Sequence, residues 1–319
     1  YSLPSMTIAE YIRTLDDPQA AISYPLQSLC ESDSGHVVMG LNPEVQQRVR
    51  AGELMVEPLQ VVRRPGLGDK VFAIAACHEY LAQHPESDLT FSGYDTDTWL
   101  KYLPWLKTGL NMKANTVVNL DNTPCNGGDR TQLMGQILGV EVTSIEFPIK
   151  VPKRNLGLPS RYYVFVPFAK QNGPRSLPLE TTLEVLRRSP LPLVFTDAKS
   201  YEFELGHGVV NRSGLGMDEL LALVAGSAGV IACDTGVPWL AAAMGKPAMV
   251  FFSHVRSWER TNTCQHVLAV DSPADCAKNC GDHVGSRPAC RWRDGVPSCT
   301  RYYTPELVRH YMREFGGLT

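Results

Sequence analysis

Short apolar segments alternate with helical segments along most of the chain, and this alternation constrains the fold more than any other feature. From residue 59 onward, each short apolar run is followed by a turn and then by a segment with apolar residues at helical spacing. Repeated strand–helix units favour parallel sheets that are covered by helices on both faces. We therefore predict an α/β protein built from doubly wound, Rossmann-like sheets.

The alternation runs through the chain twice, and a basic stretch that contains proline, Lys150–Pro159, reads as the linker between the two series. The predicted strands are Leu59–Arg63, Leu89–Phe91, Thr116–Leu120, Tyr162–Pro167, Pro192–Thr196, Gly229–Ala232 and Pro247–Phe252. The predicted helices are a segment that ends at His84, then Arg130–Leu138, Pro178–Ser189, Met217–Ser227, Val237–Gly245 and Thr304–Phe315, the last with Thr304 as its N-cap.

A length of 319 residues suits two domains better than one. We predict an unassigned N-terminal extension (1–58), a first α/β domain (59–155) and a second α/β domain (156–319). The second domain would include a Cys-rich loop (264–299) and a closing helix (304–315). Ligands of such sheets bind beyond the carboxyl ends of the strands, so we expect the two domains to face each other across a binding cleft.

Charge and cysteine usage exclude several classes of protein. The net charge is −3 without a long run of one sign, which argues against a non-specific nucleic-acid binder. No apolar stretch approaches the roughly 18 to 20 residues that span a bilayer, and the start of the chain shows no leader pattern. Four cysteines are scattered singly, at Cys30, Cys77, Cys125 and Cys233, as is typical of a reducing compartment. We expect a cytoplasmic protein without a transmembrane segment.

The first segment with candidate chemistry is Arg64–Asp69, between the first predicted strand and its helix. Gly66 and Gly68 let the backbone turn tightly and expose amides at a helix N-terminus, which suits an anion or a closely approaching substrate. Asp69 lies where an N-cap or a first-turn carboxylate would lie. Simple capping of the helix is therefore the plain alternative for Asp69.

The second segment is Cys233–Gly236, which follows an apolar strand and opens an Ala-rich helix. Backbone amides and the helix dipole make such a turn suitable for a diphosphate. Thr235 would add a hydroxyl group, and Gly236 would leave room for the ligand. An ordinary strand-to-helix turn is the alternative.

Together these segments resemble the ADP-heptose heptosyltransferase family of bacterial glycosyltransferases. Pro65–Asp69, followed by a helix, is similar to the opening motif of that family, and Asp234–Pro247 is similar to its second-domain signature. Arg175–Glu180 is similar to the segment in which the family has a basic residue, a tryptophan and a proline. The resemblance covers roughly residues 59 to 319.

The resemblance implies a GT-B fold, with the acceptor on the N-terminal domain and a nucleotide-diphosphate sugar on the C-terminal domain. It also implies that Asp69 is the general base that takes the proton from the acceptor hydroxyl. Direct attack on the anomeric carbon would then invert its configuration. We thus expect an inverting glycosyltransferase that moves a heptose or a related sugar to an acceptor hydroxyl.

The resemblance further assigns a donor-binding set. Its members are Arg175, Glu202, Asp234, Thr235, Gly236 and Trp239. Arg175 stands for the basic residue that faces the leaving diphosphate, and Glu202 is the nearest candidate for an acidic residue at the ribose. Two positions depart from the family pattern: Leu177 replaces an aromatic residue, and Trp239 replaces a histidine. An indole at position 239 puts an aromatic face near the phosphates, or else it packs between the domains.

Four cysteines lie close together near the C-terminus, at Cys276, Cys280, Cys290 and Cys299. Four thiolates at this spacing suit a structural zinc or iron, and two disulfides or reduced buried thiols are the alternatives. Members of the resembled family often have a Cys-rich segment here, and some that modify proteins bind iron through it. Such a site has no open position for chemistry, so its role would be to pin a loop. No redox cofactor is expected.

Several partners and functions stay open. The acceptor would be a hydroxyl group of a glycan such as a lipopolysaccharide core, of a protein or of a modified nucleobase. The extension 1–58 would serve acceptor recognition or a homo-oligomer contact. A sugar-nucleotide epimerase of the same architecture is one alternative function. A non-catalytic nucleotide-binding or scaffold protein is another; Trp239 favours it, whereas the presence of both Asp69 and Asp234 speaks against it.

Overall fold

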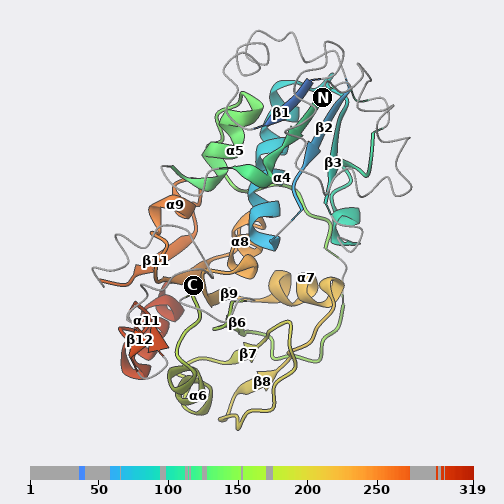
Figure 1. Cartoon of the computed structure of the whole chain (residues 1–319). Coiled ribbons are helices and arrows are strands. Elements are labelled where there is room, and N and C mark those ends of the chain that lie inside the picture. Colours follow the sequence, from blue (N-terminus) through green and yellow to red (C-terminus); the bar gives the residue numbers. More distant parts are fainter. Residues whose placement is uncertain are drawn as a thin grey trace. The chain divides into compact units, whose positions relative to one another are not determined.

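The computed structural model describes residues 36–39, 58–64, 66–93, 98–111, 114, 116–123, 128–151, 154–169, 175–273, 292–293, 296–297 and 299–319 (Figure 1). The chain divides into two compact units. Unit 1 comprises Tyr1–Pro124 and Arg130–Ile145, and unit 2 comprises Cys125–Asp129 and Glu146–Thr319.

Unit 1 contains a parallel sheet in the strand order β1-β5-β2-β3-β4. Its strands are β1 (His36–Met39), β2 (Leu59–Val62), β3 (Leu89–Ser92), β4 (Lys107–Thr108) and β5 (Thr116–Asn119). From β2 the chain adds β3 and β4 on one side, whereas β5 pairs with the other side of β2. The carboxyl ends of β2 and β5 therefore meet at a topological switch point, the place where ligands bind in open parallel sheets.

Two α-helices of unit 1, α4 (Leu67–Gln83) and α5 (Arg130–Leu138), pack against each other (Figure 1). The described part of unit 1 also contains two short 3-10 helices, η2 (Thr98–Tyr102) and η3 (Leu120–Asn122). Helix α4 buries a continuous run from Lys70 to Cys77. It ends at Gln83 with His84 as its C-cap, immediately before Pro85, which cannot continue a helix.

Unit 2 contains a six-stranded parallel sheet in the order β11-β10-β9-β6-β7-β8. The strands are β6 (Tyr163–Val166), β7 (Leu193–Phe195), β8 (Val209–Asn211), β9 (Gly229–Cys233), β10 (Ala248–Phe252) and β11 (Val267–Asp271). Taken in chain order, this arrangement is the Rossmann order, with β6 and β9 at its centre. The switch point of unit 2 therefore lies where the carboxyl ends of β6 and β9 meet.

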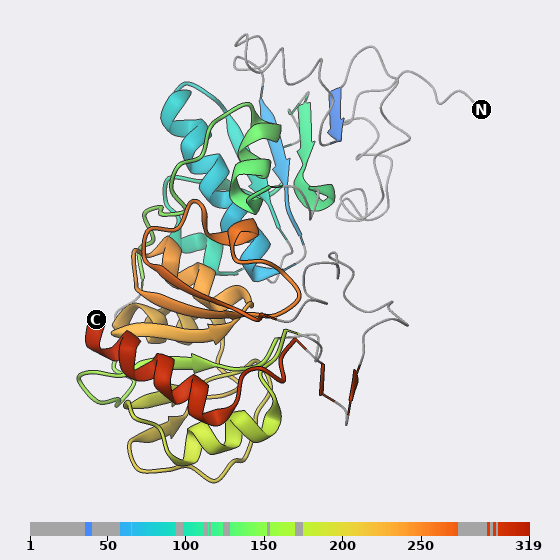
Figure 2. The same ribbon diagram turned by 90° about the vertical axis from the view of Figure 1, so that its left-hand side faces the viewer.

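The described residues of unit 2 form the helices α6 (Leu179–Arg187), α7 (Met217–Gly226), α8 (Gly236–Ala243), α9 (Trp258–Thr261) and α11 (Pro305–Leu318). They also form a small antiparallel pair of strands, β12 (Trp292–Arg293) and β13 (Val296–Pro297). Helix α11 packs beside α6 (Figure 2), and Val308, Met312 and Phe315 of α11 enter a core with Phe165 and Phe251 of the sheet. The Thr304 hydroxyl accepts a hydrogen bond from the Leu307 amide, as predicted for an N-cap. Within the described ranges of either unit, no helix is long and apolar enough to cross a membrane.

The structure confirms the predicted α/β class with two parallel sheets, and the predicted strands and helices recur within a few residues of their expected bounds. Two segments differ from the prediction. Strand β1 lies inside the extension 1–58 that was left unassigned, and strand β11 lies inside the predicted Cys-rich loop 264–299. Both are edge strands, and in the sequence pattern neither short apolar run is followed by a helical segment. The rest of 1–57 lies outside the described residues.

The two units divide between Ile145 and Glu146, before the predicted linker Lys150–Pro159. The Phe147 amide donates to the Ala243 carbonyl (3.2 Å), which fixes the chain after residue 146 to unit 2. The described residues of the linker form neither helix nor strand.

Candidate functional site

In unit 1, the turn between β2 and α4 presents the carboxylate of Asp69. Gly66 is the N-cap of α4, with φ +76°, and Asp69 lies in the first turn of the helix. A Cβ atom on Gly66 would lie 2.9 Å from Oδ2 of Asp69. Glycine is therefore required here both for its backbone conformation and for the space that the carboxylate occupies. Gly68 is the second residue of the helix.

Two buried arginines hold the Asp69 carboxylate. Arg63 Nη2 lies 2.7 Å from Oδ2, and Arg130 Nε lies 3.0 Å from Oδ1. The arginine side chains are only 3% and 4% exposed, whereas that of Asp69 is 31% exposed. Each carboxylate oxygen thus has a charge-assisted partner on its buried side, and the carboxylate remains open to solvent on the other. Asp69 does more than cap a helix.

The same two arginines are anchored on the chain that follows β5. Arg63 Nη1 donates to the carbonyl groups of Leu120 (3.0 Å) and Asp121 (2.9 Å), and Arg130 Nη1 donates to the Thr123 carbonyl (2.7 Å). Adjacent parallel strands end at the same edge, which is why residues after β5 reach residues after β2. The position of Asp69 is therefore fixed by three segments that are distant in sequence.

The Asp121 carboxylate pairs with Arg64, which follows Arg63 in the turn between β2 and α4. Its carboxylate accepts hydrogen bonds from the Arg64 backbone amide (2.8 Å) and from Arg64 Nε (2.6 Å), and its own amide donates to Asn119 Oδ1 (2.8 Å). With Arg63 and Arg130, the switch point gathers three guanidinium groups around two carboxylates. Of this cluster, our sequence analysis singles out Asp69, and it does not reveal Arg63 or Arg130.

In unit 2, three residues of the predicted donor-binding set, Asp234, Thr235 and Gly236, lie at the switch point. Strand β9 ends at Cys233, Asp234 follows, Thr235 is the N-cap of α8 and Gly236 is its first residue. The Thr235 side chain makes no capping hydrogen bond, and both Thr235 and Gly236 are half-buried. The amides of Gly236 and Val237 open the helix, which gives this turn the usual chemistry of an anion site.

Arg175 reaches the same place from the loop after β6. The Leu177 amide donates to the Pro167 carbonyl (2.8 Å), and the Ala169 amide donates to Ser176 Oγ (3.0 Å), so the loop folds back over the end of β6. Arg175 Nη1 consequently lies 3.9 Å from Oδ2 of Asp234, the former side chain being 27% exposed and the latter 5%. Leu177, where the resembled family has an aromatic residue, is part of the hydrophobic core.

Trp239 is buried and contacts two residues of its own unit. Its indole Nε1 donates to Oδ1 of Asp234 (3.1 Å), and its ring lies 6.1 Å from that of Phe252. Only 2% of the residue is exposed, so the expected aromatic face at the phosphates is not presented to solvent. The indole instead makes a polar contact with the signature carboxylate.

Electrostatics at the end of β9 also exclude one chemistry. Burial raises the pKa of the Cys233 thiol, the Asp234 carboxylate raises it further, and Arg175 opposes the rise. A thiol in this state stays protonated at neutral pH, and only a thiolate would act as a nucleophile. Cys233 is therefore a buried strand residue and not a catalytic cysteine.

The structure offers a second acidic candidate for the ribose. Glu202 is exposed and lies in the middle of the loop between β7 and β8. Asp197 comes two residues after the end of β7, is half-buried and contributes to the electrostatic field at Cys233. In Rossmann sheets, an acidic residue at the end of the second strand binds the ribose, and β7 is the second strand of this sheet. His254, buried just after β10, is a further polar group at this edge.

Three of the four cysteines of the predicted metal site, Cys276, Cys280 and Cys290, lie outside the described residues. Cys299 is described, and it is buried. Among the residues that the structure covers, no group of three or more His, Cys, Asp or Glu side chains is arranged to hold a metal ion. The structural zinc or iron stays a prediction, as do the alternatives of disulfides and reduced thiols.

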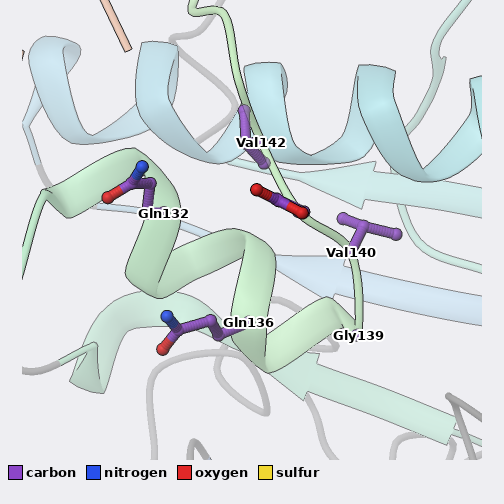
Figure 3. A pocket seen from close by; sticks show the side chains of 6 residues that line it. Gln132, Gln136, Gly139, Val140 and Val142 are labelled. Carbon is purple, nitrogen blue, oxygen red and sulfur yellow. The ribbon is translucent and has the colours of Figure 1, made fainter. Parts of the chain in front are cut away.

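A surface hollow of about 400 Å³ lies beside α5 in unit 1 (Figure 3). Gln132 and Gln136 line it from the helix, and Gly139, Val140, Glu141 and Val142 line it from the segment that follows. None of the predicted site residues borders this hollow. The candidate sites are therefore the two switch points.

No family model matches this sequence, and no curated protein matches it. Solved structures do match. TibC, an iron-containing dodecameric glycosyltransferase of enterotoxigenic E. coli H10407, is 15% identical with a TM-score of 0.64, over 83% of this chain and 78% of TibC. TibC in complex with ADP-D-beta-D-heptose gives a TM-score of 0.62 over the same shares at the same identity.

Two further structures match this chain over nearly their whole length. The ADP-heptose LPS heptosyltransferase II of E. coli is 11% identical with a TM-score of 0.54, over 81% of this chain and 98% of that enzyme. A glycosyl transferase family 9 protein of Veillonella parvula DSM 2008 is 10% identical with a TM-score of 0.59, over 84% and 99%. The chain therefore has the fold of the heptosyltransferase-like glycosyltransferases.

Proposed function

We propose that the chain is a glycosyltransferase that moves a sugar from a nucleotide-diphosphate donor to an acceptor hydroxyl group. The observation that supports this most is the meeting of Arg175 with Asp234–Gly236 at the switch point of a Rossmann-ordered sheet. A cation, a helix N-terminus and a buried carboxylate at one such edge suit a diphosphate with attached hydroxyl-bearing groups. Neighbours with this fold act on nucleotide sugars, and one of them, TibC, has been solved with ADP-D-beta-D-heptose.

In this proposal, unit 2 holds the donor. The amides of Gly236 and Val237 and the guanidinium of Arg175 bind the diphosphate, and Asp234 binds a hydroxyl of the donor. Asp197 is our preferred residue at the ribose, with Glu202 as the alternative. As the bond between the anomeric carbon and the diphosphate breaks, Arg175 and the start of α8 stabilise the charge that develops on the leaving oxygen.

Unit 1 holds the acceptor and supplies the base. The acceptor hydroxyl transfers its proton to the solvent-facing side of the Asp69 carboxylate, and its oxygen forms the new bond to the anomeric carbon from the face opposite the diphosphate. One displacement of this kind inverts the anomeric configuration. Arg63 and Arg130 fix the orientation of the Asp69 carboxylate. A positioned base of this type contributes roughly 10²- to 10⁴-fold to a reaction rate.

A donor screen tests the proposal. Purified protein is mixed with ADP-heptose and with GDP-, UDP- and dTDP-sugars, each alone and with a glycan, a protein or a DNA acceptor, and thermal stabilisation and nucleotide release are measured. We expect stabilisation by one donor class, and its loss in Asp234→Asn. Release should depend on an acceptor and should fall by about 10²-fold or more in Asp69→Asn.

The variant Asp69→Glu is the matched control, because it keeps the negative charge between Arg63 and Arg130 but moves the carboxyl group. It should retain the melting temperature and the donor affinity while it loses transfer. If no nucleotide sugar stabilises the protein and Asp69→Asn and Asp234→Asn behave as wild type, the transferase proposal is wrong and a scaffold role is favoured. Turnover of the donor without any acceptor would favour an epimerase.

The metal and oligomer predictions are tested on the same sample. Elemental analysis of the purified protein would detect zinc or iron at the predicted thiolate site, and light scattering would give the oligomeric state. TibC is an iron-containing dodecamer, which motivates both measurements for this chain.

A further inference from the structure

The two oxygens of the Asp234 carboxylate have different surroundings. Oδ1 accepts the indole hydrogen bond of Trp239 at 3.1 Å. Oδ2 is buried, has no hydrogen-bond partner among the described residues and faces Arg175 Nη1 at 3.9 Å. The Nε atom of Arg175 is likewise buried and without a partner in this part of the chain. Arg175 thus lies near the carboxylate without forming a close pair with it.

This loose arrangement is unusual for an arginine beside a buried carboxylate. Arginine pairs with carboxylates preferentially through two parallel hydrogen bonds, one to each oxygen. A buried charge without a close partner is costly, so a carboxylate with two open oxygens would draw the guanidinium group inward. The indole N–H competes with Arg175 for Oδ1; in the structure Arg175 faces Oδ2, and 27% of its side chain stays exposed.

We propose that Trp239 is a positioning residue for the donor site: it binds Oδ1 of Asp234 and thereby keeps the guanidinium group of Arg175 available to the donor diphosphate. This inference rests on the proposed function and deepens it. In the resembled family a histidine at this position presents an imidazole near the phosphates. Here the single N–H of the indole is already donated to Asp234, so Trp239 acts on the ligand through Arg175.

Removal of the indole N–H should let Arg175 collapse onto Asp234. Trp239→Phe keeps a buried aromatic ring but frees Oδ1, and the guanidinium group then pairs with both oxygens. We expect the affinity for a nucleoside diphosphate to fall about tenfold, since a charge-assisted hydrogen bond is lost from the ligand. Trp239→His should restore most of the affinity, because an imidazole N–H can again donate to Oδ1.

A double-mutant cycle separates this role from simple packing. Calorimetric titrations with ADP, GDP and UDP are made on wild type, Trp239→Phe, Arg175→Ala and the double variant. If Trp239 acts through Arg175, Trp239→Phe has no further effect in the Arg175→Ala background. Affinities for adenosine, guanosine and uridine, which lack the diphosphate, should be the same in all four proteins.

Trp99→Phe serves as the control. Trp99 is a buried tryptophan of unit 1 whose indole N–H has no partner among the described residues, so its loss should leave nucleotide affinity unchanged. The inference fails if Trp239→Phe binds diphosphates as wild type does, weakens them by the same factor in both backgrounds, or weakens nucleosides equally. Wild-type protein that binds no nucleoside diphosphate would overturn the proposed function itself, and this inference with it.

Discussion

Arg130 Nε lies 3.0 Å from Oδ1 of Asp69, although 61 residues separate the two in the chain. Arg130 begins α5 and Asp69 lies in the first turn of α4, so this ion pair joins the starts of the two packed helices. Together with Arg63, it makes Asp69 the counter-ion of two buried guanidinium groups.

Replacement of Arg130 should therefore destabilise unit 1. In Arg130→Leu the volume is nearly kept, but Asp69 loses one partner and the Thr123 carbonyl loses its donor. We expect a loss of about 2–4 kcal/mol in the free energy of unfolding, measured by urea denaturation, because a largely buried pair is broken. Arg154→Ala, at the exposed pair with Asp218, should lose no more than about 0.5 kcal/mol. Equal losses in the two variants would contradict a stabilising role for the ion pair between Arg130 and Asp69.

Gly66→Ala should impair transfer by displacing Asp69. The new Cβ atom would meet Oδ2 of Asp69 at 2.9 Å, in addition to the strain of φ +76°. Gly208→Ala is a matched control, because Gly208 has φ +77° and open space around its Cα. Both variants should lose about 1–2 kcal/mol of stability from the backbone strain. Only Gly66→Ala should slow sugar transfer, and an equal rate for both would show that the Asp69 position is unimportant.

The two acidic candidates for the ribose can be compared directly. Asp197→Asn should weaken binding of the nucleoside diphosphate that wild type prefers by about tenfold, because a charge-assisted hydrogen bond to a hydroxyl is lost. Glu202→Gln should change the affinity less than twofold, since Glu202 is exposed. With a 2′-deoxynucleotide, the penalty for Asp197→Asn should shrink. A larger loss of affinity in Glu202→Gln than in Asp197→Asn would favour Glu202 as the residue that binds the ribose.

Cys264 should make stability fall at alkaline pH. Burial, and then the nearby Asp129 carboxylate, raise the pKa of this thiol from 9.0 to about 12. The folded state keeps the proton that the unfolded chain loses above pH 9, so the stabilising contribution is complete below pH 9 and disappears as pH rises toward 12. The free energy of unfolding should fall by up to about 1.4 kcal/mol per pH unit from this thiol alone.

Urea denaturation of wild type and Cys264→Ala at pH 7, 8, 9 and 10 checks this. The two curves should run parallel below pH 8.5, which is the internal control, and the variant should decline less steeply between pH 9 and 10. Because burial also raises the pKa values of Cys77 and Cys233, some decline persists in the variant. Parallel curves over the whole range would refute the contribution of Cys264.

The sequence predicted the architecture well because its signals are local. The apolar run Leu59–Val62 and the helical spacing that follows it depend only on neighbouring residues, and the parallel pairing of such units follows from their alternation. Strand β1 (His36–Met39) was missed because no helical pattern next to it supports a strand–helix unit. Its place beside β5 is set by contacts between distant residues.

The site was predicted less completely, for the same reason. Asp69 and Asp234 were singled out as candidates because glycines and helix starts mark them in the sequence. Arg63 and Arg130 carry no such mark, and their pairing with Asp69 requires the adjacency of the β2 and β5 ends. For Trp239 we expected an aromatic face near the phosphates or packing between the domains, and not a hydrogen bond to Asp234, since a sequence does not show where an indole N–H points.

The ion pairs that Asp69 forms with Arg63 and Arg130 also affect how such a protein can evolve. A substitution that removes this carboxylate takes a close counter-ion away from two buried guanidinium groups, and so it threatens folding before it threatens transfer. Drift toward an inactive descendant would need compensating changes at Arg63 and Arg130, and we expect the three positions to covary among relatives. Selection for a folded chain thus preserves the same group that selection for transfer would preserve.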